Sequence, residues 1–202
     1  MTTEALEAFF TKIGAYTDLS AGAKRAWESL LQPRQYRRNE HFIREGDVPT
    51  HYAFVVEGLL CQRYVGRDGD TIIKYFFPEH RIAASVSATL LGRPSLFSIE
   101  AIEDSFVLEY EFAAFKALTR EFPDIAAFYI NYMERHWIIE KEPVEIALRH
   151  DDAIQRYLDF IHKEPELHKR LKQHHVAAWL GITPESLSRL RKTIALGRLG
   201  RR

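Results

Sequence analysis

The stretch from Val176 to Lys192 constrains the fold of this chain most, because it predicts two short helices joined by a tight corner. Gly181 can adopt the left-handed conformation that ends a helix, and Thr183 can cap the start of the next one. Pro184 then takes the first helical position, where its missing N–H group is no loss. The pattern is typical of a helix-turn-helix.

The second of these helices has an apolar face and a polar face. Leu187, Leu190 and Ile194 recur at intervals of three and four residues and define the inward face. The opposite face suits the major groove of DNA, because Arg can bind guanine through two hydrogen bonds and a carboxylate can accept one from cytosine. Its residues are Glu185, Ser188, Arg189 and Lys192. An ordinary helical hairpin with a polar outer face is the alternative interpretation.

The distribution of charge favours the helix-turn-helix. Residues 169–202 contain nine Lys or Arg residues and one acidic residue, Glu185, which gives a net charge of +8. The whole chain has 28 Lys and Arg and 28 Asp and Glu residues, so residues 1–168 carry −8. A basic end beside such a motif favours a polyanion as partner.

The segment GITPESLSRLRK, residues 181–192, resembles the recognition helix of the Crp/Fnr superfamily of bacterial transcription regulators. In that family a Glu and an Arg four residues later read base edges, and Glu185 and Arg189 occupy those positions here. The resemblance implies a homodimer that binds a pseudo-palindromic site in double-stranded DNA and regulates transcription. An activator of this kind would also contact RNA polymerase.

Seven residues are predicted to contact DNA or to shape the contact surface. Arg189 and Glu185 are expected at base edges, and Ser186 and Ser188 at bases or phosphates. Lys192 and Gln173 are expected at the DNA backbone, Gln173 through the positive end of its helix. The full set is Gln173, Thr183, Glu185, Ser186, Ser188, Arg189 and Lys192.

Length and composition indicate an ordinary globular protein. At 202 residues and 46% hydrophobic content, the chain suits one large domain with a small one. Cys61 is the only cysteine, which excludes an internal disulfide, a cysteine-ligated iron–sulfur cluster and a CxxC zinc site within one chain. No uncharged stretch approaches about 18 residues, and no signal segment is present, so we expect a cytoplasmic protein without a membrane partner.

The first part of the chain predicts two helices followed by many short strands. Residues 2–13 and 20–31 read as helices, the second capped by Ser20 and stopped by Pro33. The clearest hairpin runs over residues 59–77, where Asp68 and Gly69 predict a type I′ turn. Repeated turn signals predict an antiparallel sandwich or barrel. The first helix carries an apolar stripe that is expected to cover this domain: Leu6, Phe9, Phe10 and Ile13.

Residues 35–110 resemble the cyclic-nucleotide-binding β-roll of the same superfamily. The resemblance rests on FIREGD and YAFVVEGLL and on turn glycines at Gly46, Gly58 and Gly69. It implies an N-terminal sensor domain.

One segment departs from the members that bind cyclic AMP, which carry a Glu for the ribose and, about ten residues later, an Arg for the phosphate. Here Ser85 falls at the Glu position, and Ser95 or Leu96 at the Arg position. A buried phosphate without a cation loses charge-assisted hydrogen bonds worth roughly 1.5–3 kcal/mol each. Arg93 would substitute only if the loop shifted. The roll is therefore not expected to bind cyclic AMP as its relatives do, and its effector stays open; the candidate pocket residues are Ser85, Arg93 and Ser95.

From Pro123 a long helical segment resembles the dimerisation helix of the superfamily. Packing against its own roll is the alternative. Pro143 should kink or break the helix and so create a hinge. The predicted dimer seam follows heptad spacing, with polar residues at two of its positions: Ile125, Phe128, Tyr132, Arg135, Ile139, Glu142 and Ile146.

Residues 150–171 restart a helix, with Asp151 as the expected N-cap and an apolar stripe at Ile154, Leu158 and Ile161. Only ten residues follow Lys192, so we expect the two-stranded wing of the superfamily to be short or absent. Arg198, Arg201 and Arg202 would supply phosphate contacts in its place. His162, His168, His174 and His175 do not have metal-ligand spacing.

These observations predict an α+β protein in three parts. They are a jelly-roll-like β-roll sensor (residues 1–120), a dimerisation helix (121–149) and a helix-turn-helix domain (150–202). No enzymatic activity, cofactor or metal is expected. A cupin-type oxygenase would need a His-x-His pair and a nearby Glu, whereas His41, His51 and His80 stand alone. The other alternative is a small-molecule or nucleotide sensor that acts on a protein partner.

Overall fold

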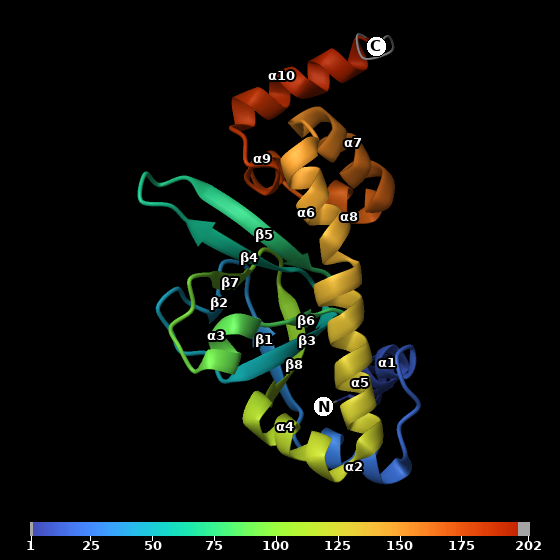
Figure 1. The fold of residues 1–202 in the computed structure, drawn as a ribbon. Coiled ribbons are helices and arrows are strands. Elements are labelled where there is room, and N and C mark those ends of the chain that lie inside the picture. Colours follow the sequence, from blue (N-terminus) through green and yellow to red (C-terminus); the bar gives the residue numbers. More distant parts are fainter. Residues whose placement is uncertain (1, 198–202) are drawn as a thin grey trace. The chain divides into compact units, whose positions relative to one another are not determined.

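Two four-stranded sheets form the centre of the β-rich part of the chain in the computed structural model, which describes residues 2–197 (Figure 1). In spatial order, the first sheet contains β1 (Gln32–Tyr36), β8 (Ser105–Glu111), β3 (His51–Glu57) and β6 (Ile82–Ala83). The second contains β2 (His41–Ile43), β7 (Ser98–Ala101), β4 (Leu60–Val65) and β5 (Thr71–Phe77). The β1–β8, β3–β8, β3–β6, β2–β7 and β4–β7 pairs are antiparallel, which confirms the predicted antiparallel sheet domain and the α+β class.

Helices cover one face of the first sheet. Successive residues of a strand point to opposite faces, so only alternate side chains enter the core under these helices. On β8, Leu108 and Tyr110 pack into the helix-covered core, so Val107 and Glu109 face the opposite way. The covering helices are α1 (Thr3–Gly14), α2 (Ala21–Glu28), α4 (Phe112–Glu121) and α5 (Pro123–Glu134).

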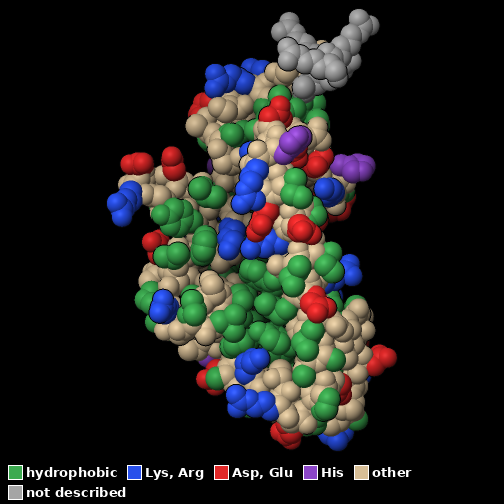
Figure 2. All heavy atoms as spheres, viewed as in Figure 1, with side chains coloured by type: hydrophobic (Ala, Val, Ile, Leu, Met, Phe, Trp, Pro, Cys, Tyr) green, Lys and Arg blue, Asp and Glu red, His purple; other side chains and the backbone are tan. Residues whose placement is uncertain are grey.

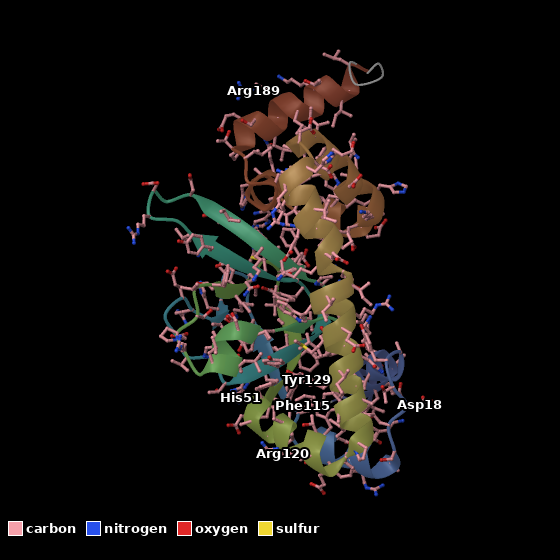
Figure 3. The ribbon with its side chains drawn as sticks, in the orientation of Figure 1. Asp18, His51, Phe115, Arg120, Tyr129 and Arg189 are labelled. Carbon is pink, nitrogen blue, oxygen red and sulfur yellow. The ribbon has the colours of Figure 1, made fainter. Side chains whose placement is uncertain are left out.

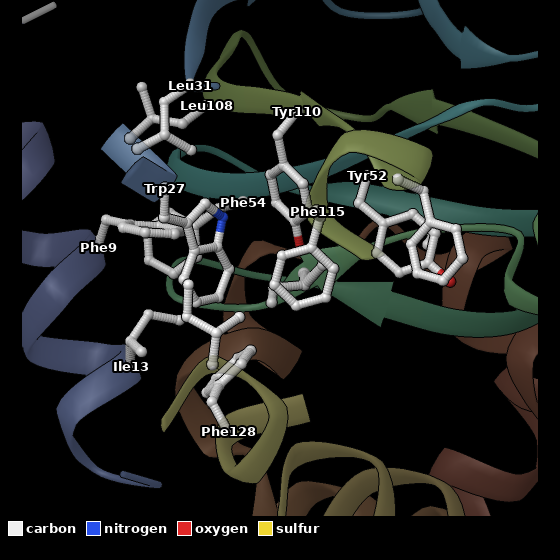
Figure 4. Close-up of a cluster of buried hydrophobic side chains, with 14 of the residues drawn as sticks. Phe9, Ile13, Trp27, Leu31, Tyr52, Phe54, Leu108, Tyr110, Phe115 and Phe128 are labelled. Atoms are coloured by element: carbon white, nitrogen blue, oxygen red, sulfur yellow. The ribbon is translucent and has the colours of Figure 1, made fainter. Parts of the chain in front are cut away.

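Trp27 occupies the centre of this core and is fully buried (Figure 4). The ring centroids of Phe9, Phe115 and Phe128 lie 5.1, 4.8 and 5.0 Å from its ring. Such aromatic pairs contribute about 0.5–1.5 kcal/mol each beyond the area that they bury. The expectation for the first helix is confirmed, since Phe9 and Ile13 are buried and its other stripe residues pack against the same core.

Two local predictions in this region are wrong. The second helix ends at Glu28, five residues before Pro33, which lies inside β1. The β4–β5 hairpin has no two-residue type I′ turn, because Gly69 has a φ of +82° but Asp68 has no positive φ. Instead the Gly66 N–H donates to the Asp70 carbonyl at 2.8 Å, which leaves a three-residue loop with a left-handed glycine at its end.

The long helix is not broken at Pro143 as predicted; it becomes irregular earlier, while its backbone stays helical on both sides, at Glu134 and Glu140. A π-helical segment, η1 (Arg135–Ile139), follows α5, and the Glu140 N–H donates to the Arg135 carbonyl at 2.9 Å. A new helix, α6 (Lys141–His150), then begins. Pro143 is its third residue, where a helix has no use for the missing N–H group.

The first half of the predicted dimer seam packs inward. Ile125 and Phe128 are 0% and 1% exposed in the core of the roll, and Tyr132 packs against the same core. The alternative interpretation therefore holds for this half of the seam. Ile139 and Ile146 are 66% and 61% exposed.

Four helices follow in the remainder of the described chain: α7 (Ala153–Lys163), α8 (Pro165–Arg170), α9 (Gln173–Leu180) and α10 (Pro184–Ala195). The cap of α7 is Asp152, whose side chain accepts from the Gln155 N–H at 2.8 Å, and not Asp151 as predicted. The helix buries Tyr157 and Phe160, while the predicted stripe is only half-buried. The aromatic rings of Tyr157 and Phe160, which lie between the stripe positions in sequence, are buried instead.

The described chain divides into two compact units. Residues 2–63 and 76–141 form the first, and residues 64–75 and 142–197 form the second. Along the long helix, the boundary between the two units lies between Lys141 and Glu142, just after the π-helical segment.

Candidate nucleic-acid interface and sensor pocket

The corner between α9 and α10 has the geometry that its residues predict. Gly181 adopts the left-handed conformation, with φ 69° and ψ 34°. The Ile182 N–H donates to the Ala177 carbonyl at 3.0 Å, which closes the end of α9. Thr183 caps α10, because its hydroxyl accepts from the Ser186 N–H at 3.2 Å.

One face of α10 is buried and the opposite face is open to solvent. Leu187 and Leu190 are 0% and 7% exposed. The exposed side carries Glu185, Arg189 and Lys192, and Figure 3 shows Arg189 on α10. Ser186 and Ser188 are half-buried.

The polar side chains at the start of α10 form hydrogen bonds with one another. A guanidinium nitrogen of Arg189 donates to the Ser186 hydroxyl oxygen at 3.2 Å, and the Thr183 hydroxyl lies 3.2 Å from the same oxygen. Hydrogen bonds from its own backbone N–H and from the Thr183 hydroxyl lower the pKa of Glu185, and Arg189 adds to this. Glu185 is therefore a carboxylate near neutral pH and can only accept hydrogen bonds.

Gln173 does not point its amide nitrogen away from the protein. This nitrogen donates to the Pro184 carbonyl at 2.7 Å and so joins the start of α9 to the start of α10. Its side chain positions the second helix.

Arg191 is a residue whose role the sequence reasoning missed. Its Nε donates to the Tyr157 hydroxyl at 3.0 Å, and its guanidinium lies 5.5 Å from the centroid of that ring. His168 lies beside it, and burial together with the charge of Arg191 lowers the pKa of His168. The sequence contains a signal for this role. Arg191 follows Leu187 by four residues, so the two side chains lie on the same, inward face of the helix.

Arg156 was also missed and links two helices. Its guanidinium donates to the carbonyls of Asp151 at 2.6 Å and Leu180 at 3.0 Å. The Leu180 carbonyl is at the end of α9, where carbonyl groups lack partners within the helix.

The remaining histidines do not converge. His174 and His175 have rings 4.1 Å apart, His168 packs on Tyr157, and His162 is exposed. Within residues 2–197, no group of three or more His, Cys, Asp or Glu side chains is arranged to hold a metal ion. The predicted phosphate contacts at Arg198, Arg201 and Arg202 lie outside the described residues.

The candidate effector segment brings two of its three predicted residues together. It comprises the end of β6, helix α3 (Val86–Leu91) and the loop to β7. The hydroxyl oxygens of Ser85 and Ser95 lie 2.8 Å apart, and each residue is 2% exposed. The Ser95 hydroxyl also donates to the Phe97 carbonyl at 2.7 Å. Arg93 is exposed and does not join them.

Comparison with known proteins agrees with this architecture. Residues 33–122 match the family model of the cyclic nucleotide-binding domain. The structure of FixK2 from Bradyrhizobium japonicum matches with a TM-score of 0.69 and 18% sequence identity, over 85% of this chain and 88% of that chain. The chain has the fold of a Crp/Fnr-type regulator.

Two further structures share the Crp/Fnr-type fold. CLP from Xanthomonas campestris, a global regulator described as responsive to c-di-GMP, matches with a TM-score of 0.70 and 17% identity, over 89% of this chain and 94% of that chain. CooA from Carboxydothermus hydrogenoformans, solved as a mutant, matches with a TM-score of 0.66 and 17% identity, over 89% and 81%. No curated protein matches the sequence significantly. Across residues 2–197, no helix has the length and hydropathy that a membrane span requires.

Proposed function

We propose that this Crp/Fnr-type chain is a cytoplasmic, homodimeric regulator of transcription that reads a DNA sequence through α10. The observation that carries the proposal is the orientation of α10, which buries Leu187 and Leu190 and leaves Glu185 and Arg189 exposed. We assign residues 1–120 to the sensor, 121–149 to the dimerisation helix and 150–202 to the helix-turn-helix domain. A helix presented in this way by a basic domain fits the major groove.

We assign a role to each of the seven predicted DNA-binding residues. Arg189 and Glu185 contact bases, and Ser186 orients Arg189 through the hydrogen bond at 3.2 Å. Ser188 contacts a base or a phosphate, and Lys192 contacts phosphate. Gln173 and Thr183 fix the orientation of α10 and lie near the DNA backbone. If the protein activates transcription, a further surface contacts RNA polymerase.

The dimer forms through a different face of α5 from the one that the heptad pattern indicated. Figure 2 shows hydrophobic side chains gathered on the surface beside α5. Tyr129, Met133 and Trp137 line a shallow hollow there, and Ile130 is 54% exposed. Ile130, Met133 and Trp137 are spaced by three and four residues, as a helix seam requires. Two-fold symmetry of the dimer implies a pseudo-palindromic site in double-stranded DNA, with half-sites about one DNA turn, roughly 34 Å, apart.

The sensor does not use cyclic AMP in the way that the family resemblance would imply. The Ser95 hydroxyl donates to the Phe97 carbonyl and accepts from the Ser85 hydroxyl, and among the described residues of the segment there is no buried cation for a phosphate. A phosphate bound there would lose its charge-assisted hydrogen bonds.

The test is selection of bound fragments from random-sequence DNA at two salt concentrations, with the full chain and two variants. Arg189→Ala should cost about 1–3 kcal/mol on the preferred sequence and blur preference at one base pair. Lys192→Ala is the matched control. It should weaken binding to all sequences alike and reduce the slope of log K against log salt by about one.

The outcomes separate the alternatives. A palindromic motif that wild type recovers and Arg189→Ala blurs supports the proposal. Motif-free binding that disappears at the higher salt would mean that the basic end is only an electrostatic patch. The sensor would then act on a protein partner. Unchanged preference in Arg189→Ala would show that another residue reads the bases.

A further inference from the structure

A second cavity opens in the first unit, apart from the effector segment. It has a volume of about 370 Å³ and lies between β1, β8 and β2, beside the loop from β2 to β3. Pockets for small molecules occupy about 300–1,000 Å³. Its lining includes Tyr36, Phe42, Asp47, Val48, His51 and Glu109. His51, at the start of β3, is labelled in Figure 3.

Glu109 gives this cavity its chemistry. It lies on the face of β8 that points away from the helices and is only 8% exposed. Ala53, its neighbour in register on β3, leaves room because it carries only a methyl group. Among the described residues, no Lys, Arg or His forms an ion pair with Glu109. A buried carboxylate without a cation is costly, so the site favours a positively charged ligand.

Tyr36 is the polar partner of Glu109. Its hydroxyl donates to one carboxylate oxygen at 2.5 Å. Burial, and then the hydrogen bond to Glu109, raise the pKa of Tyr36, so it remains a donor. Tyr36 uses only one of the hydrogen bonds that the Glu109 carboxylate can accept. The carboxylate can therefore accept further hydrogen bonds from a ligand.

The walls of the cavity suit the apolar part of an organic cation. The rings of Tyr36 and Phe42 lie 6.1 Å apart at 74°, and Val48 is 51% exposed. Aromatic faces attract ammonium groups through the ring quadrupole. Asp47 adds a second carboxylate, and the lining contains no Lys or Arg. This set of groups disfavours an anion such as a nucleotide.

We propose that this cavity binds a small organic ammonium ion, with its charge at Glu109 and its apolar part against Tyr36 and Phe42. The inference does not depend on DNA binding. The loop beside the cavity is bonded to the effector segment, because the Ser95 N–H donates to the Asp47 carbonyl at 2.8 Å and the Gly46 N–H to the Ser95 carbonyl at 2.9 Å. A ligand in the cavity therefore contacts a loop that is joined directly to the Ser85 and Ser95 pair.

The experiment is isothermal titration calorimetry of the full chain with three probes. Choline and ethanolamine carry the ammonium charge, and 3,3-dimethylbutan-1-ol has the shape of choline without it. We expect saturable binding of at least one cation and none of the neutral alcohol. Failure of both cations to bind up to about 10 mM, or equal binding of the alcohol, would overturn the proposal.

Variants identify the site. Glu109→Gln keeps an acceptor for Tyr36 but removes the charge, and should weaken binding by about tenfold or more. Glu111→Gln removes an exposed carboxylate from the end of the same strand and should change nothing. Phe42→Leu preserves an apolar wall without an aromatic face and should weaken choline binding. Binding that survives both Glu109→Gln and Phe42→Leu would place the cation elsewhere and contradict the proposal.

Discussion

At the scale of single residues, two arginines two positions apart on α10 have different surroundings. Arg189 is exposed, whereas Arg191 is half-buried against Tyr157, with a hydrogen bond of 3.0 Å and a ring contact of 5.5 Å. A count of basic residues treats the two alike, but only an exposed guanidinium can reach DNA.

Arg191→Ala should lower the free energy of unfolding by about 1–2 kcal/mol, because it removes both contacts with Tyr157 and leaves its hydroxyl with one partner fewer. Arg189→Ala is the matched control and should stay within about 0.5 kcal/mol of wild type. Urea unfolding followed by circular dichroism measures both. Equal stabilities would show that the Tyr157 contact contributes nothing.

At the scale of elements, a polar cluster holds the π-helical segment against the roll and against Tyr16, which follows α1. His136 lies 2.7 Å from Glu140 through Nδ1 and 2.6 Å from the Tyr16 hydroxyl through Nε2. Glu140 in turn pairs with Arg81 at 3.3 Å, from the turn before β6. Since π-helical geometry is rare, this cluster gives a physical reason for the position of the π-helical segment.

Acid should weaken this cluster. Burial lowers the pKa of His136 from its usual 6.5, so the unfolded chain takes up a proton before the folded one does. Stability contributed by neutral His136 is then present above about pH 6.5 and is lost progressively as the pH falls below it. His136→Gln does not titrate and should flatten the pH dependence of chemical unfolding between pH 7 and 5. An unchanged pH profile in this variant would contradict the assignment.

The first half of the predicted dimer seam shows why spacing alone does not identify the dimer face of a helix. Ile125, Phe128 and Tyr132 satisfy a heptad seam, yet they fill the core beside Trp27. A helix that packs on its own sheet and a helix that pairs with a partner need the same apolar spacing. Only the burial of each residue distinguishes the two.

At the scale of the whole molecule, the proposed dimer makes the surface beside α5 essential for DNA binding. Ile130→Glu places a charge in the proposed seam and should shift sedimentation from dimer to monomer, with loss of operator binding. Ile130→Leu keeps the apolar contact and should remain dimeric. A dimer that persists in Ile130→Glu would require another interface.

The closed pair of Ser85 and Ser95 predicts that cyclic AMP and cyclic GMP leave the thermal stability of the protein unchanged. A specific ligand at 100 times its Kd would add about 2.7 kcal/mol, which corresponds to about 5–10 °C in Tm for a chain of this size. Differential scanning calorimetry with each nucleotide measures this directly. A concentration-dependent rise of that order with either nucleotide would overturn our assignment of the pocket.

The sequence alone determined the features that depend on neighbours along the chain. The caps at Ser20 and Thr183, the left-handed turns at Gly58 and Gly181 and the alternation of the strands all follow from local sterics and hydrogen bonding. Tertiary structure alone decided which groups meet across the fold. It turned Arg191 inward, closed Ser85 on Ser95 and buried Glu109 beside Tyr36. Burial and pairing depend on residues distant in sequence, and no local spacing specifies them.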